Sequence, residues 1–312
     1  MKKYLLLFFV CPLISKAQSP DSVRHLLDTV ITIVRNEALH RDEVNWDSLK
    51  KEVYRKELAP SIQTLFMSLK DGHGGLIYKG ARYGMAWPVP AISAAMMAQL
   101  RTQGPPKLKI SLLSGAYGYI LIPPFNGGSQ ADNDRFAQEI RDSICKLSSS
   151  KLKGWIIDLR MNLGGNMWPM MAGLGPLIGD GKVGSFVQSQ NWYIKNGDAY
   201  LEGTRLASAR SLCQIGTNCK IAVLIGPLTQ SAGEAVAISL IGRQNTRSFG
   251  EPTGGYVTAN LTHVLGQAKL MVAAFWEADR NGHIYKEKLQ PDISVDTERI
   301  IPTALQWLQD IP

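Results

Sequence analysis

The 312-residue sequence lacks the features by which metal sites, nucleic-acid surfaces and membrane spans are usually recognised. Its four cysteines have no spacing typical of a zinc site. Charged residues make up 19% of the chain and the formal net charge is +8, but no block of Lys or Arg indicates a nucleic-acid partner. No apolar run is long enough to cross a bilayer, and there is no internal repeat or low-complexity segment. We therefore expect no metal, no other cofactor and no stable membrane insertion.

The first 17 residues have the layout of a secretory signal peptide. Met1-Lys2-Lys3 is a charged start, residues 4–14 form a short apolar stretch, and Ser15-Lys16-Ala17 places small residues where a signal peptidase cleaves. Cleavage before Gln18 would remove three lysines and lower the formal net charge from +8 to +5. The leader predicts an exported protein, either periplasmic or extracellular.

Export would place the remaining cysteines in an oxidising compartment. Cys213 and Cys219 flank a short glycine-containing loop, so we consider them as a disulfide pair. Cys145 falls on one face of a predicted helix and is interpreted as a buried apolar residue. Cys11 follows Val10, which is a poor context for lipid attachment, so a lipoprotein is the less favoured alternative.

Apolar periodicity divides the chain into a helical first part and an α/β remainder. Residues 20–72 carry three apolar stripes at helical spacing, the last of them ended by Gly72. Beyond about residue 80, strands alternate with helices, and residues 155–159 and 221–225 have the continuous apolar character of strands buried on both faces. This pattern predicts a helical N-terminal subdomain over 18–79. It predicts an α/β core over 80–312, built on a mostly parallel sheet covered by helices.

Ser231 stands where one of these buried strands passes into a helix. Gly226 and Pro227 end the strand, and small or apolar residues follow Ser231 at helical spacing. A hydroxyl at such a junction is held by rigid elements and lies near free N–H groups that stabilise an anion. For an isolated serine, an N-cap role would be the simpler explanation. The neighbouring turns favour a functional one.

Three glycine-rich turns accompany this junction. Asp71-Gly72-His73-Gly74-Gly75 places a histidine directly after a helix, in a setting that suits a general base. Gly164-Gly165 and Gly254-Gly255 each follow a predicted strand. Because the carboxyl ends of parallel strands emerge at one edge of a sheet, we expect Ser231 and these two glycine pairs to line one cleft. The residue two before Ser231 is Thr229, which excludes the nucleophile elbow of the α/β-hydrolases.

Four segments together resemble the tail-specific, or C-terminal-processing, serine peptidase family, which includes the tricorn protease core and the interphotoreceptor retinoid-binding proteins. They are residues 71–73, 154–165, 231–234 and 291–293, and they follow the order found in the family. The resemblance implies a crotonase-like (ClpP-like) α/β core and a serine-type peptidase that acts on a peptide or protein without a cofactor. The segment 79–114 is too short for the PDZ domain that many relatives insert there, so the cleft itself would recognise the substrate.

The family has two catalytic branches, and the sequence favours one of them. In the Ser–Lys branch a lysine follows the second turn, and this sequence has Tyr256 at that position. The tricorn-like branch uses a histidine, a serine and a late glutamate, which His73, Ser231 and Glu287 match here. The other candidates are Glu277 and Glu234 for the glutamate, and His263 and His283 for the histidine.

The resemblance implies an acyl-enzyme mechanism. Neutral His73 would accept the proton of Ser231, and the glutamate would hold the imidazole in the required tautomer. Backbone N–H groups of Ala232 and of Gly164 or Gly165 would form the oxyanion hole. A carboxylate partner and the preceding helix end would raise the imidazole pKa above its usual value of about 6.5. A non-catalytic ligand- or peptide-binding protein and a small-ester hydrolase are the alternative functions on this scaffold.

Overall fold

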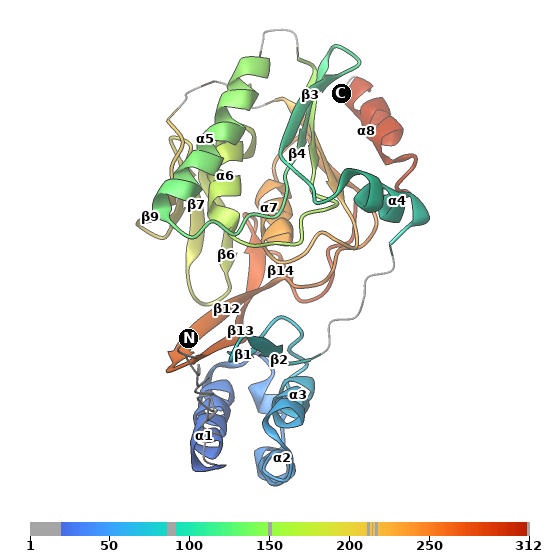
Figure 1. Ribbon diagram of the computed structural model, residues 1–312. Helices are drawn as coiled ribbons and strands as arrows, with labels where there is room; N and C mark the ends of the chain where they lie inside the picture. The colour runs from blue at the N-terminus through green and yellow to red at the C-terminus, as the bar shows by residue number, and fades with distance from the viewer. Residues whose placement is uncertain are drawn as a thin grey trace, which may run out of the picture.

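The computed structural model describes residues 20–85, 92–148, 152–210, 213, 215 and 218–310 (Figure 1). The predicted signal peptide lies outside this range. No helix in the described part of the chain has the length and apolarity that a membrane span requires.

Three α-helices and a short 3₁₀ helix form the N-terminal end of the molecule, and the α-helices lie where the three apolar stripes predict them (Figure 1). Their inward faces bury a small core that includes Val34, Ile62 and Phe66, and Leu76 and Leu270 from two strands complete it. The helices are α1 (Pro20–Glu37), the 3₁₀ helix η1 (Arg41–Glu43), α2 (Trp46–Val53) and α3 (Leu58–Ser68).

A nine-stranded sheet connects these helices to the rest of the chain. Its neighbouring strands are all antiparallel, so the predicted mostly parallel sheet is wrong for this part of the fold. The predicted subdomain boundary at residues 79/80 falls in the turn between its strands β1 and β2. In order, the strands are β2 (Ala81–Tyr83), β1 (Gly75–Tyr78), β13 (Ala268–Asp279), β6 (Gly181–Phe186), β7 (Asn191–Lys195), β8 (Asp198–Leu201) and β9 (Thr204–Ala207), while β12 (Thr258–Leu265) and β14 (Ile284–Tyr285) also pair with β13.

The second sheet has six strands, and here the predicted parallel arrangement holds. All its neighbours are parallel except the edge hairpin of β3 with β4. The two strands read from their continuous apolar runs, β5 and β10, lie side by side at its centre. In order, the strands are β15 (Ile293–Ser294), β11 (Thr246–Gly250), β10 (Lys220–Ile225), β5 (Gly154–Asp158), β4 (Tyr117–Leu121) and β3 (Lys109–Leu113).

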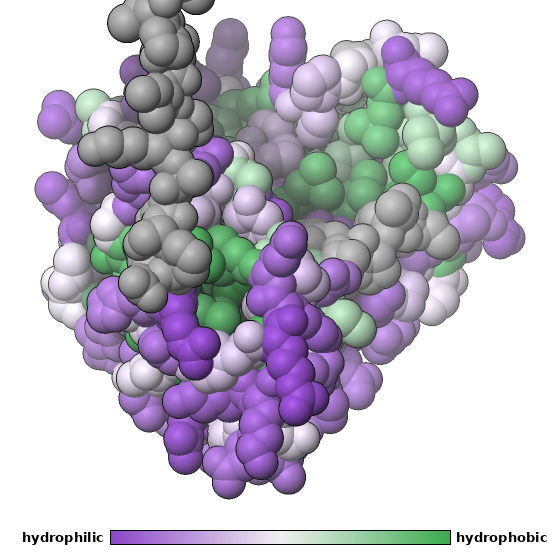
Figure 2. Space-filling model, turned by 60° about the horizontal axis from the view of Figure 1, so that its bottom comes forward, coloured by the Kyte–Doolittle hydropathy of each residue, from purple (hydrophilic) through white to green (hydrophobic). Residues whose placement is uncertain are grey.

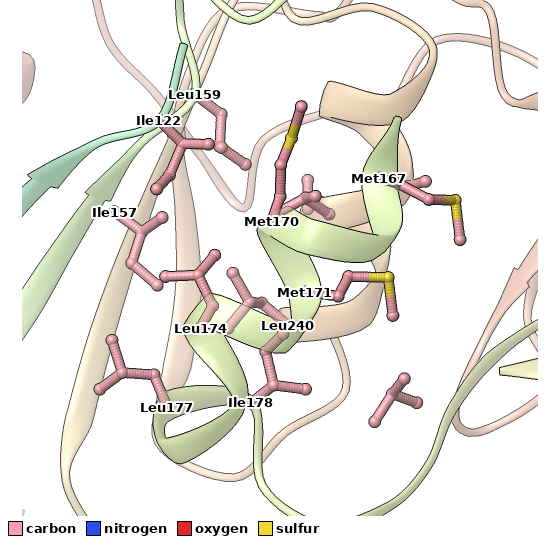
Figure 3. Packing of buried hydrophobic residues seen from close by; sticks show 14 of the residues in the cluster. Ile122, Ile157, Leu159, Met167, Met170, Met171, Leu174, Leu177, Ile178 and Leu240 are labelled. Carbon is pink, nitrogen blue, oxygen red and sulfur yellow. The ribbon is translucent and has the colours of Figure 1, made fainter. Parts of the chain in front are cut away.

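Helices cover both faces of the second sheet. Successive residues of β5 alternate between the faces: Ile157 packs in the core shared with three helices, and Ile156 packs against α8. Figure 3 shows Leu174 and other α6 side chains directed at Ile157. The helices are α5 (Gln130–Leu147), α6 (Met167–Ile178) and α7 (Ala232–Leu240) on one face and α8 (Ile300–Gln309) on the other; α4 is Ala94–Gln103.

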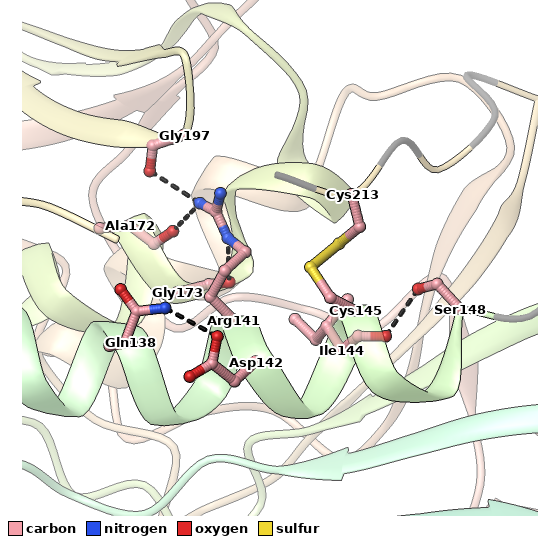
Figure 4. The surroundings of a disulfide bond; sticks show 10 residues. All are labelled: Gln138, Arg141, Asp142, Ile144, Cys145, Ser148, Ala172, Gly173, Gly197 and Cys213. Atoms are coloured by element: carbon pink, nitrogen blue, oxygen red, sulfur yellow. Dashed lines mark hydrogen bonds between the residues drawn. A yellow bond between two sulfur atoms is a disulfide. The ribbon is translucent and has the colours of Figure 1, made fainter. Parts of the chain in front are cut away.

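A disulfide between Cys145 and Cys213 ties the C-terminal end of α5 to the segment that precedes β10 (Figure 4). The predicted Cys213–Cys219 pair is therefore wrong. Cys219 is a half-buried free thiol immediately before β10. The helix brings Cys145 to Cys213 across 68 residues of sequence, a long-range contact that spacing along the chain does not reveal. One turn earlier, the buried Arg141 guanidinium donates to carbonyl groups of α6 and of the β7–β8 turn.

Candidate active site

Ser231 is the residue between β10 and α7, and its backbone is strained. Its φ of 52° and ψ of −117° lie outside the regions that non-glycine residues ordinarily adopt, which costs about 1–3 kcal/mol and is concentrated at functional sites. Two hydrogen bonds hold this turn. The Ser231 N–H donates to the carboxylate of Glu234 (2.9 Å), and the Gln230 N–H donates to the Asn162 carbonyl (2.9 Å). The hydroxyl is therefore presented by a rigid turn.

His73 lies across from this serine, on the turn between α3 and β1. Its Nε2 is 2.9 Å from Ser231 Oγ, and its Nδ1 is 2.8 Å from Thr258 Oγ1 on β12. The imidazole thus bridges two hydroxyl groups that come from different sheets. The sequence motif that singled out His73 and Ser231 contains no signal for Thr258, because the hydrogen bond spans 185 residues.

The buried carboxylate of Asp71 holds the His73 turn from the inside. Its Oδ1 accepts from the N–H groups of His73 (3.0 Å) and Gly74 (2.6 Å), and its Oδ2 accepts from the Ala273 N–H of β13 (3.0 Å). A side chain at Gly74 would collide with Asp71 and Phe66, so glycine is required at this position. The turn is consequently fixed to the central strand of the nine-stranded sheet.

The environment of His73 lowers its pKa to about 4. Burial is the largest cause, because it penalises the charged imidazolium, and the positive charge of Arg82 acts in the same direction. A hydrogen bond to the backbone of Thr258 opposes both effects. The upward shift expected from the sequence is therefore wrong. It assumed a carboxylate partner, and a hydroxyl stands at that place instead.

Glu234, one of the alternative glutamates, is fully buried but does not contact His73. Besides Ser231, its carboxylate accepts from the N–H groups of Gly255 (2.8 Å) and Tyr256 (2.7 Å) and from the hydroxyl of Thr253. Burial raises its pKa, and these donors act against that rise. The Glu234 carboxylate therefore links the serine turn to the 253–256 turn through hydrogen bonds and fixes the two turns relative to each other.

The other predicted residues lie away from the serine–histidine pair. Glu287 is exposed and has no hydrogen bond within the described residues, so the structure does not place it as the partner of His73. Glu277 is buried in β13 next to Glu234, and burial raises its pKa well above the usual value. His263 pairs with Glu37 at 2.6 Å, and His283 contacts the ring of Tyr285. Neither alternative histidine bonds to Ser231.

The paired glycines approach the serine turn closely. Gly164 and Gly165 have φ values of 107° and 108°, and a side chain at Gly164 would lie 2.9 Å from the Cβ of Ser231. The Gly164 N–H donates to the side chain of Asn162 at 3.0 Å. Among the described residues, the Gly165 and Ala232 N–H groups have no hydrogen-bond acceptor. Those two amides are therefore the ones available for an oxyanion.

A cavity of about 250 Å³ adjoins His73. Viewed from the end that carries the N-terminal helices, the surface has apolar side chains gathered in hollows between polar margins (Figure 2). Tyr256 stands at the cavity with its ring centroid 5.6 Å from that of His73. The apolar lining comes from Leu39, Leu69, Met85, Ala273 and Trp276, and Lys70 and Lys286 supply amino groups.

Comparison with known proteins identifies the family. Residues 116–295, more than half of the chain, match the model of peptidase family S41, and the chain belongs to this family. It is 30% identical over 197 residues to a nisin-resistance protein of Lactococcus lactis subsp. lactis; the match covers 61% of this chain and 59% of that protein. The resemblance seen in the sequence is thereby confirmed.

Two solved structures share the fold at low sequence identity. A lipoprotein from Streptococcus agalactiae has a TM-score of 0.68 at 20% identity, with 99% of each chain covered. A photosystem II D1 C-terminal processing protease has a TM-score of 0.56 at 16% identity, covering 92% of this chain and 96% of that one. The α/β architecture with N-terminal helices is therefore that of peptidase family S41.

Proposed function

We propose that this protein is an exported serine-type peptidase in which Ser231 is the nucleophile and His73 the general base. The observation that carries the proposal is the 2.9 Å contact between Ser231 Oγ and His73 Nε2. A base must lie within hydrogen-bond reach of the proton that it removes, and this contact meets that requirement. The low pKa of His73 supports the role as well, because it keeps the imidazole neutral and able to accept a proton at neutral pH.

The reaction follows from the arrangement of the donors and acceptors. Ser231 Oγ attacks the peptide carbonyl carbon while its proton passes to His73 Nε2, and the carbonyl oxygen becomes an oxyanion facing the Gly165 and Ala232 amides. As the tetrahedral intermediate collapses, Nε2 gives this proton to the departing amine. A water molecule then enters, gives a proton to His73 Nε2 and attacks the acyl carbon. The bond from that carbon to Ser231 Oγ breaks as Nε2 returns the proton to Oγ, which releases the acid and restores the free serine.

In this proposal Thr258 takes the place of the late glutamate. Its hydroxyl oxygen accepts from the Nδ1–H of His73, so Nε2 carries the lone pair that faces Ser231. A hydroxyl orients the ring but adds no negative charge to stabilise the imidazolium that forms during the reaction. This difference favours a weakly basic histidine and slow turnover compared with a carboxylate-assisted triad.

The peptide substrate is supported by an exposed apolar side chain near the site, and the exported location by the leader and by a structural relative. Leu163, adjacent to the proposed oxyanion hole, has 50% of its surface exposed and offers an apolar contact to a peptide. The predicted leader at residues 1–17 supports export. So does the likeness to a streptococcal protein described as a lipoprotein, because lipoproteins lie outside the cytoplasm.

The decisive experiment treats the purified protein with a fluorophosphonate and locates the labelled peptide by mass spectrometry. We expect a single adduct on Ser231, its absence in Ser231→Ala, and hydrolysis of a casein or peptide-library substrate by the wild type alone. Failure to label Ser231 would indicate a non-catalytic binding protein. Labelling with hydrolysis of small esters but of no peptide would indicate an esterase.

A further inference from the structure

Arg82 holds the outer side of the His73 turn. It lies on β2, and its Nη2 donates to the carbonyl oxygens of His73 (3.1 Å) and Gly74 (2.7 Å). The side-chain amide of Asn260 donates to the His73 carbonyl as well (3.4 Å). Asp71 accepts hydrogen bonds from the N–H groups of the same two residues. Asp71 and Arg82 together therefore satisfy the backbone N–H and carbonyl groups of this turn.

We propose that Arg82 is a positioning residue that fixes the His73 turn and keeps the imidazole uncharged, so that it sets the lower pH limit of activity. This inference rests on the proposed function, because it concerns His73 as a base. A guanidinium keeps its positive charge at every pH of interest, and the charge of Arg82 acts on the imidazole as well as on the backbone of the turn. That charge disfavours a second positive charge on the imidazole.

The other charged groups around the ring do not reverse this effect. Asp71 carries the nearest negative charge and attracts Arg82, but its carboxylate is bound to three N–H donors of the turn and of β13, and Arg82 still lowers the His73 pKa. Lys70 and His40 at the cavity both pair with Glu43. The remaining titratable groups facing the ring from neighbouring elements are Tyr256 of the 253–256 turn, Lys286 after β14, and Glu234 of α7, whose carboxylate is bound to the serine turn.

The electrostatics of the site agree with this geometry. After burial, the charge of Arg82 is the second cause of the lowered His73 pKa. Arg82 is itself exposed, so its charge acts partly through solvent and is open to screening by salt. Loss of this charge therefore raises the pKa of His73, and activity that rises with pH through that pKa begins at a higher pH.

The test measures the rate of fluorophosphonate labelling of Ser231 as a function of pH. In Arg82→Met we expect the acid limb, which is the rise of the labelling rate with pH through the His73 pKa, to move upward by about half a pH unit or more. The shift is modest because the charge of the exposed Arg82 acts through a dielectric near that of water. We also expect the plateau rate to fall several-fold, since the turn loses two hydrogen bonds. Arg82→Lys should restore the position of the limb more fully than the plateau. Arg247→Met, which removes an exposed arginine from β11 of the other sheet, should change neither.

Salt provides a measurement that needs no variant. Raising the ionic strength to about 1 M should move the acid limb of the wild type upward, toward that of Arg82→Met, because screening weakens the same charge. An acid limb that stays in place in folded Arg82→Met, or in the wild type at high salt if that variant does not fold, overturns the proposal while leaving Ser231 as nucleophile. Absence of labelling at every pH overturns the proposed function and this inference with it.

Discussion

Removing the hydroxyl of Thr258 tests which residue orients the base. In Thr258→Val the Nδ1 of His73 loses its hydrogen bond of 2.8 Å with the Thr258 hydroxyl, while the branched shape suited to a β-strand is kept. During catalysis the imidazole becomes charged, and a hydrogen bond to a charged group contributes about 1.5–3 kcal/mol. At 1.36 kcal/mol for each factor of ten, we expect kcat to fall roughly 10- to 150-fold.

The assay is steady-state hydrolysis of a fluorogenic peptide, with thermal melting to verify the fold. Thr258→Ser keeps the hydroxyl and should retain most of the activity. Glu287→Gln should change kcat by less than about twofold, because the Glu287 side chain is exposed and does not contact His73. Full activity in Thr258→Val combined with a large loss in Glu287→Gln would refute this reasoning and restore the glutamate as the third member of the site.

Three further changes test other parts of the structure. In Gly165→Ala the new Cβ would lie 2.2 Å from the carbonyl oxygen of Phe125, so the backbone must shift and the Gly165 N–H is displaced from the proposed oxyanion hole. We expect kcat for peptide hydrolysis to fall by about 100-fold or more. Cys145→Ser should lower the free energy of unfolding by up to about 4 kcal/mol in urea denaturation, because the disulfide closes a long loop. Cys219→Ser, which removes the free thiol, is its control. Glu277→Gln should become progressively more stable than the wild type as pH rises from about 4.5 through the raised folded-state pKa of this carboxyl. The reason is that the folded wild type must then either ionise a buried group or retain its proton, which glutamine avoids. Melting temperatures of both proteins across pH measure the effect, and an equal difference at all pH values would contradict it.

The parts of the fold that follow from local pattern could be predicted, and those that depend on long-range pairing could not. Periodicity located the N-terminal helices and the buried strands β5 and β10, because burial on one or both faces leaves a direct trace in the residues. The antiparallel pairing of other strands with β13 left no such trace in the sequence. Alternating strands and helices suggest parallel pairing wherever they occur, and only the tertiary structure shows β1 beside β13.

The same distinction applies to the site. The sequence brought His73 and Ser231 together through motif context, and the structure places their side chains 2.9 Å apart. Thr258 and Arg82 lie outside the four segments that carry the family resemblance, and they reach His73 only through the folding of two different strands. The expectation of a glutamate was carried from the family pattern, and the register of β12 with β13 places a threonine at that position.

The arrangement of the site along the chain has a consequence for biosynthesis. His73 and Ser231 are 158 residues apart, and Thr258, which contacts the histidine ring, lies 185 residues beyond it. Asp71 of the histidine turn also accepts a hydrogen bond from the N–H of Ala273, near the middle of β13. A chain emerging from the ribosome or from an export channel therefore carries an unassembled base until about nine-tenths of it has been released. Proteolytic capacity would arise only as the last long strand joins the sheet.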